Sequence, residues 1–172
     1  KTSVGEMSKN RITWLMVLMI SATLTGYIIQ KYEATFAAIP ALVTFIPMLT
    51  DTGGNAGSQS STMVIRGLSL GEVSTSDFIK VWFKEFRVSL VVGFILSLAN
   101  FARIVLLNPG EYAIALTVSL SMYATVILSK TIGGILPILA KKLNFDPAIM
   151  AAPLITTIVD TLTLIVYFYV AN

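Results

Sequence analysis

One acidic residue, Asp160, lies near the middle of the run Pro147–Val170, which contains no other charge. A run of this length crosses a bilayer as a helix, because a helix rises about 1.5 Å per residue and the hydrocarbon core is about 30 Å thick. A carboxylate at that depth costs roughly 2.5–3.5 kcal/mol on insertion scales. Asp160 therefore needs either a partner, for which Lys130 is the candidate, or a function such as lining a cation path.

The composition predicts an all-α integral membrane protein. Hydrophobic residues make up 55% of the 172 residues and charged residues only 12%, whereas soluble domains carry about 25% charged residues. The chain has no Cys and no His, which excludes disulfides, zinc and haem sites, and Cys or His nucleophiles. Any bound metal must use oxygen ligands, which suit Mg²⁺, Ca²⁺ or Mn²⁺. With no nucleophile–base set and no phosphate loop, we expect no enzyme, and a net charge of +3 gives no reason to expect a nucleic-acid partner.

Five apolar runs predict five membrane helices in each protomer, surrounded by lipid. We place them at about 12–29, 34–66, 79–107, 112–141 and 147–170, within a pore domain 12–172 that follows a cytoplasmic connector 1–11. Most Lys and Arg residues then lie on one side, which puts the N-terminus in the cytoplasm and the C-terminus outside the cell membrane. An odd number of crossings cannot form two equal inverted halves, so symmetry around a pathway requires an oligomer. Because the chain begins with Lys1, we expect it to be part of a longer protein.

The second run is unusual in its middle. Pro40 and Pro47 each lack a backbone donor, and the segment Asp51–Gln59 places three glycines among small polar side chains. We expect this segment to break the helix. Irregular backbone at membrane depth occurs where it is buried in protein or faces a water-filled cavity. Close helix packing through small residues is the alternative interpretation, and the sequence leaves both open.

The fifth run has matching features. Asp146 and Pro147 form a typical helix start, with Asp as the N-cap, and Pro153 frees a carbonyl within the helix. The spacing puts four residues on one face of this helix, namely Ala152, Thr156, Asp160 and Thr163. A stripe of small, hydroxyl and carboxylate side chains is what a hydrated cation needs from a pore wall. Lys130 lies at a similar depth in the fourth run, so an ion pair with Asp160 is also possible.

Two linked motifs cover most of the chain. The first, P-x(5)-GGN-x-G-x-QS followed by V-x-R, comprises Pro47, Gly53, Gly54, Asn55, Gly57, Gln59, Ser60, Val64 and Arg66. The second, DPA-x(4)-P-x(3)-T-x(2)-D-x(6)-Y, comprises Asp146, Pro147, Ala148, Pro153, Thr157, Asp160 and Tyr167. Together, at this spacing, they resemble the transmembrane domain of the MgtE family of magnesium channels.

The resemblance implies a homodimer whose pore lies on the two-fold axis between the second and fifth helices. It assigns Asp160 to a selectivity site for hydrated Mg²⁺, with pore-lining positions at Asn55, Ala152 and Thr156, partly through backbone oxygen. It places Asp146 near the cytoplasmic mouth and implies upstream cytoplasmic regulatory domains. Structural roles fall to the motif's helix-shaping residues, which are Pro47, Gly53, Gly54, Gly57 and Pro153.

Two positions depart from the family pattern. Ala152 stands where family members can carry Asn, and Lys130 stands where a neutral polar residue is expected. The leading interpretation is a dimeric Mg²⁺ channel that could also bind Mn²⁺, Co²⁺ or Ca²⁺. One alternative is an ion- or proton-coupled secondary transporter. Another is a non-transporting membrane subunit in which Asp160 and Lys130 form an assembly pair.

Overall fold

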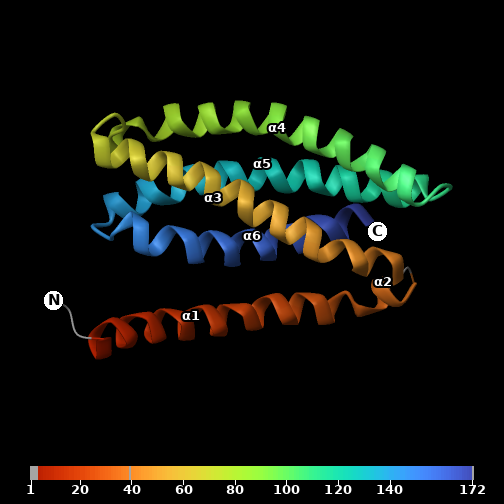
Figure 1. Ribbon diagram of the computed structural model, residues 1–172, viewed down its shortest axis with the longest axis horizontal. Coiled ribbons are helices and arrows are strands. Elements are labelled where there is room, and N and C mark those ends of the chain that lie inside the picture. The colour runs from red at the N-terminus through yellow and green to blue at the C-terminus, as the bar shows by residue number, and fades with distance from the viewer. Residues whose placement is uncertain (1–3, 39, 172) are drawn as a thin grey trace.

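The computed structural model describes residues 4–38 and 40–171, without the side chains of 148–153 and of several residues in the first two helices. The described residues form helices and no strands (Figure 1). In chain order the elements are α1 (Val4–Lys31), α2 (Glu33–Ala38), the 3-10 helix η1 (Pro40–Phe45), α3 (Ile46–Leu70), the 3-10 helix η2 (Thr75–Asp77), α4 (Phe78–Leu107), α5 (Tyr112–Lys142) and α6 (Pro147–Ala171).

The long helix α5 is the centre of the bundle. It packs against α3, α4 and α6, while α4 and α1 lie at opposite edges of the molecule (Figure 1). The side of α5 that faces its neighbours carries small residues such as Ala115, Ser121 and Gly133, all buried. Small side chains let helix backbones approach closely, which is how helices associate where lipid removes the hydrophobic driving force.

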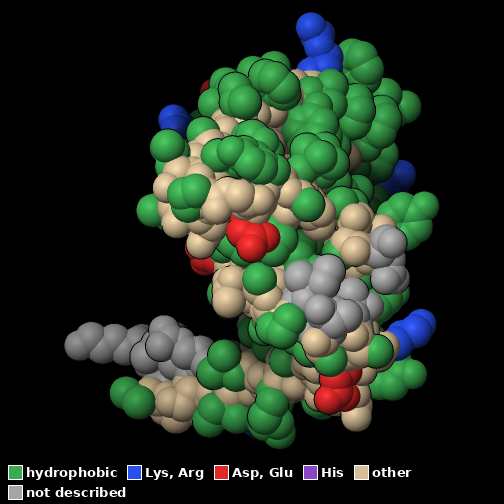
Figure 2. Space-filling view, turned by 90° about the vertical axis from the view of Figure 1, so that its right-hand side faces the viewer, with side chains coloured by type: hydrophobic (Ala, Val, Ile, Leu, Met, Phe, Trp, Pro, Cys, Tyr) green, Lys and Arg blue, Asp and Glu red, His purple; other side chains and the backbone are tan. Residues whose placement is uncertain are grey.

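The surface has the character of a membrane protein. Hydrophobic side chains cover much of the end of the molecule seen in Figure 2, where charged side chains are few. On α4, large apolar side chains such as Phe94, Leu98 and Leu106 are more than half exposed. Within the described residues, three helices are long and apolar enough to cross a membrane, at Thr75–Leu107, Tyr112–Lys142 and Leu154–Ala171. The other two of the five expected crossings stay predictions.

The predicted helix boundaries agree closely in the second half of the chain and less well in the first. The ranges 79–107, 112–141 and 147–170 correspond to α4, α5 and α6 within one residue at each end. By contrast, α1 begins at Val4, so most of the connector expected at 1–11 already belongs to the first helix. The range 34–66 is divided among α2, η1 and α3, and α3 continues to Leu70.

The expected break at the glycine segment was wrong. Helix α3 runs without interruption through Asp51–Gln59, and the chain instead changes direction before it, where η1 begins at Pro40. Pro47 lies in the first turn of α3, where a backbone N–H has no helical partner to lose. Each interior glycine costs about 1 kcal/mol of helix propensity, and the contacts of the glycine face with α5 and α6 offset that cost.

Two contacts hold the first half of the chain onto α6. The Tyr167 hydroxyl donates a hydrogen bond of 2.8 Å to the carbonyl oxygen of Leu42 in η1, and both residues are buried. Tyr32, next to α1, stacks on Phe168 with ring centroids 4.4 Å apart. These contacts fix where α3 starts relative to α6, and the space between those two helices is the candidate site.

Candidate functional site

A cavity of about 340 Å³ opens between α3 and α6. It brings together Pro47, Gly54, Asn55, Thr156 and Asp160, which the sequence analysis named individually, with Thr50 and with Asp51 and Ser58 of the segment Asp51–Gln59. The motif of the second run and the motif of the last run therefore meet at one place, although their residues are about a hundred positions apart. Apart from Pro47 and Gly54, every lining side chain offers oxygen.

Asp51 is the lining carboxylate that the sequence analysis did not assign to the site. It is exposed, lines the cavity, and accepts a hydrogen bond of 3.1 Å from the Asn55 side-chain nitrogen at its Oδ2. That bond fixes the amide so that the Asn55 oxygen is left to accept from another donor. The signal was present in the sequence, since residues four apart share a helix face. The expectation of a broken helix at Asp51–Gln59 obscured it.

The α6 side of the cavity is only partly as expected. Thr156 and Asp160, four residues apart, both line it. Thr163 does not: it is buried, and its Oγ1 would lie 3.1 Å from a Cβ added at Gly53, on the packed side of α3. Three residues on a helix fall about 60° short of a full turn, so Thr163 is rotated away from Asp160, toward the packed side of α3. The side chains of Ala152 and Pro153 lie outside the described residues.

The three glycines of α3 divide into two groups. A Cβ at Gly53 would lie 2.8 Å from both Thr125 and Val159, and one at Gly57 would lie 2.7 Å from Ile155. Gly53 and Gly57 therefore serve close packing against α5 and α6. A Cβ at Gly54 would meet nothing nearer than Thr156, at 3.9 Å, and would project into the cavity. Close packing therefore describes Gly53 and Gly57, whereas Gly54 lines the cavity from an unbroken helix.

Lys130 faces a different partner from the one the sequence suggested. It is 3% exposed, and its Nζ donates a hydrogen bond of 2.9 Å to Oε1 of Gln59. Its electrostatic partner is Glu85 of α4, a buried carboxylate that accepts a bond of 2.6 Å from Ser60. Among the described residues no ion pair joins Lys130 to Asp160, so the assembly pair proposed as an alternative does not form within the chain.

Asp146 does not line the α3–α6 cavity. It lines a second cavity of about 430 Å³ together with Lys141 and residues near the C-terminal end of α3, including Leu68. The Lys141 ammonium donates a bond of 3.2 Å to the Leu68 carbonyl, which ties α5 to α3 there. The two carboxylates, Asp146 and Asp160, thus lie in separate cavities along α6.

The chemistry of the α3–α6 cavity suits a hard cation that keeps its water. Carboxylate, amide and hydroxyl oxygens are the groups that such ions prefer. In the part of the chain that the structure describes, no three carboxylates gather closely enough to form a metal cage. In a single chain, Asp51 and Asp160 are the two carboxylates that line this cavity.

A known protein family matches most of this chain. The family model named MgtE, described as a divalent cation transporter, matches residues 46–170, from the first residue of α3 almost to the end of α6. The chain belongs to the MgtE family. MgtE proteins are transporters and not enzymes, which confirms the prediction that this chain has no enzymatic function.

Three similar proteins each carry the name Magnesium transporter MgtE. The chain is 37% identical to the protein of Bacillus subtilis and 33% identical to that of Thermus thermophilus, covering 94% of this chain in both cases. It is 29% identical to the protein of Enterococcus faecalis, covering 98% of this chain. The aligned region spans only 36–39% of these MgtE relatives, so they contain further sequence beyond it.

Proposed function

We propose that the chain forms the membrane pore of a Mg²⁺ transporter, passing hydrated Mg²⁺ across the cytoplasmic membrane down its electrochemical gradient. The observation that carries this proposal is the α3–α6 cavity, into which both family motifs contribute oxygen-bearing side chains around Asp160. Membership of a divalent cation transporter family supports it, as do the names of the three relatives.

The pore is completed by a second copy of the chain. Asp51, Asn55 and Thr156 are exposed on the surface of one protomer, on helices that pack in a bundle with apolar surroundings. Polar side chains at membrane depth face water or protein and not lipid, so a partner must cover this face. A two-fold axis along the α3–α6 cavity would place the polar faces of two protomers opposite each other. They would then enclose a path lined by two copies of each side chain.

The paired carboxylates explain why a divalent ion would be favoured. Two Asp160 side chains roughly 8 Å apart repel each other by about 2 kcal/mol at an effective dielectric of about 20. A divalent cation between them reverses the sign of that interaction. Because Mg²⁺ releases its water reluctantly, the ion is held through its hydration shell, with Asp160, Asn55 and Thr156 accepting from the bound water. The same oxygens would accept Mn²⁺, Co²⁺ or Ca²⁺.

The topology follows from the charges at the helix ends. Five crossings place Lys80, Lys84, Lys141 and Lys142 on the cytoplasmic side, with the C-terminus outside. Asp146 then lies near the cytoplasmic mouth and the cavity with Asp51 opens nearer the outer side. Regulatory cytoplasmic domains precede this segment in the full-length protein, in accordance with the greater length of the relatives.

The test is Mg²⁺ uptake by liposomes containing the full-length protein. We expect Asp160→Asn to reduce uptake at least tenfold while the protein stays folded and dimeric, since Asp160 forms no ion pair among the described residues. Glu111→Gln, which removes an exposed carboxylate in the α4–α5 connection, is the matched control and should leave uptake unchanged. Retained uptake in Asp160→Asn would contradict the assignment of this residue.

A coupled transporter is the second candidate, and one observation favours it. Asp51 and Asp160 share the cavity, so a proton could bind to one as an ion leaves the other. Coupling predicts that an opposing pH gradient drives Mg²⁺ against its own gradient. A channel predicts a current that follows voltage and the Mg²⁺ gradient alone.

A further inference from the structure

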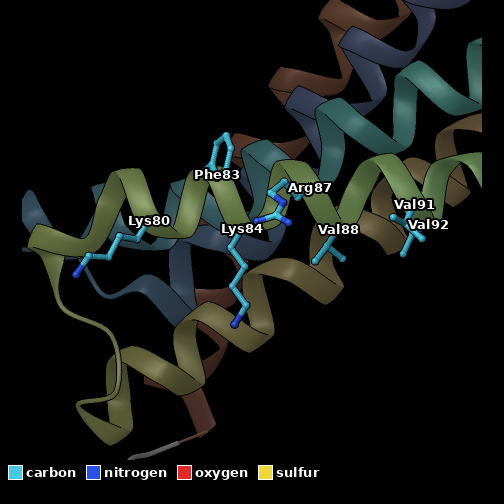
Figure 3. Close-up of a pocket in the computed structure, with 7 residues that line it drawn as sticks. All are labelled: Lys80, Phe83, Lys84, Arg87, Val88, Val91 and Val92. Atoms are coloured by element: carbon cyan, nitrogen blue, oxygen red, sulfur yellow. The ribbon is translucent and has the colours of Figure 1, made fainter.

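A third cavity lies on α4, and none of its lining residues belongs to α3 or α6. Its volume is about 700 Å³ and seven residues of α4 line it, namely Lys80, Phe83, Lys84, Arg87, Val88, Val91 and Val92. Spacings of three and four residues place them along one strip of the helix. The cations occupy the first part of the strip and the valines the second, and Figure 3 shows the Lys80 and Lys84 side chains extending from α4 with the valines farther along.

The position of this strip matches the boundary between headgroups and acyl chains. The 30 residues of α4 extend about 45 Å, which exceeds the hydrocarbon thickness of about 30 Å. The apolar part that follows Arg87 is long enough to fill the hydrocarbon core. Lys80, Lys84 and Arg87 then lie at headgroup level, while Val88 and Val91 lie at the level of the acyl chains. Helix α4 is at the edge of the bundle (Figure 1), and Phe83 and Val91 of the strip are more than half exposed.

The charges of the strip are accessible and uniformly positive. The Lys80 side chain is 85% exposed, although its ammonium contacts Asp77 at 3.0 Å, and the Arg87 guanidinium lies 5.8 Å from the centroid of the Phe83 ring. An exposed ion pair such as Lys80–Asp77 is weak and leaves the cation able to bind another anion. Glu85 does not weaken the field, because its carboxylate is turned inward to Ser60. Among the described residues, no acidic side chain lines the cavity.

We propose that this strip of α4 binds an anionic phospholipid. Its phosphate lies among Lys80, Lys84 and Arg87, and its acyl chain lies along Val88, Val91 and Val92. Charge complementarity selects an anionic headgroup, and the adjoining apolar strip, with Val91 61% exposed, requires a ligand that has a hydrocarbon tail attached to that headgroup. A soluble phosphate would satisfy the cations and leave the valines uncovered.

The test is lipid binding by the full-length protein in detergent, measured by native mass spectrometry with phosphatidylglycerol and phosphatidylcholine of identical acyl chains. We expect phosphatidylglycerol to bind more tightly, and Lys84→Gln or Arg87→Gln each to weaken it about fivefold, which corresponds to the attraction of one cation to an anionic lipid. Lys142→Gln, which removes an exposed cation outside the cavity, is the matched control and should change nothing.

A variant of the apolar part distinguishes a lipid from a free anion. Val91→Ser should weaken binding of the long-chain lipid and leave the preference for an anionic headgroup unchanged. Equal binding of the two lipids by the unchanged protein would overturn the proposal. Equal losses from Lys84→Gln and Lys142→Gln would also overturn it, because they would indicate a general effect of surface charge. Burial of Lys84 by a second copy of the chain would overturn it as well.

Discussion

Two faces of α3 serve opposite purposes. On the packed face, Gly53 and Gly57 are buried against α5 and α6 with no room for a Cβ, and Ser60 is buried and bonds to Glu85 of α4. The open face, with Asp51, Gly54 and Asn55, lines the cavity. Both faces are built from small and polar residues, so composition alone does not separate them. The comparison teaches that the same residue types can bring helices together on one side and line an open cavity on the other.

The largest effect is expected on the packed face. Gly57→Val should prevent most of the protein molecules from folding. The new Cβ would lie 2.7 Å from Ile155 and 3.1 Å from the Ser129 carbonyl oxygen. Overpacking in a core costs about 1–3 kcal/mol, and here rigid backbone opposes relaxation. The yield of monodisperse protein and its thermal midpoint measure this. Wild-type stability in Gly57→Val would mean that the packed face is not packed as described.

The next effect concerns the buried charges behind this face. Lys130→Met should lower the free energy of unfolding by about 1–3 kcal/mol, because the Lys130–Gln59 hydrogen bond is lost and the buried Glu85 carboxylate loses the nearby opposite charge. Mg²⁺ uptake per folded protein should stay close to that of the wild type. Thermal unfolding of Lys130→Met, Glu85→Gln and the double variant measures the coupling, and we expect the double variant to recover at least half of the loss. Recovery by Asp160→Asn instead would favour the Lys130–Asp160 pair.

Gly54→Val probes the open face and sharpens the contrast with Gly57→Val. The new side chain would project toward Thr156 and narrow the path, so we expect Mg²⁺ uptake to fall several-fold. Its thermal midpoint should fall less than that of Gly57→Val, since a Cβ at Gly54 makes only an ordinary contact. Equal losses of uptake and stability in the two variants would remove the distinction between the faces.

The smallest effect is expected at Asp51. Asp51→Asn keeps the shape of the side chain and removes one charge from the cavity, so we expect a loss of uptake of a few-fold, smaller than that of Asp160→Asn. Asp51→Ala should lose more, because the hydrogen bond that orients Asn55 is removed as well. Initial rates of Mg²⁺ uptake over a range of concentrations measure both. No change in either variant would exclude Asp51 from the ion path.

Much of the helical architecture and part of the site follow from local sequence. Long apolar runs bounded by charges located α4, α5 and α6 within one residue, because helix length and hydrophobicity are properties of a single segment. The four-residue spacing of Thr156 and Asp160 put both on the face that lines the cavity. The two motifs were sufficient to indicate the family to which the chain belongs.

The tertiary structure decided which residues face one another. The sequence offered Asp160 as the partner of Lys130, whereas the structure places Lys130 beside Gln59 of α3 and near Glu85 of α4, because the choice depends on how α5 is rotated against α3 and α4. The orientation of α3 likewise places Gly53 and Gly57 in the interface with α5 and α6, and leaves Gly54 open to the cavity. Sequence alone determined that a carboxylate lies within a membrane helix. Helix packing determined that it faces a cavity and not a lysine, since packing is set by contacts between segments far apart in the chain.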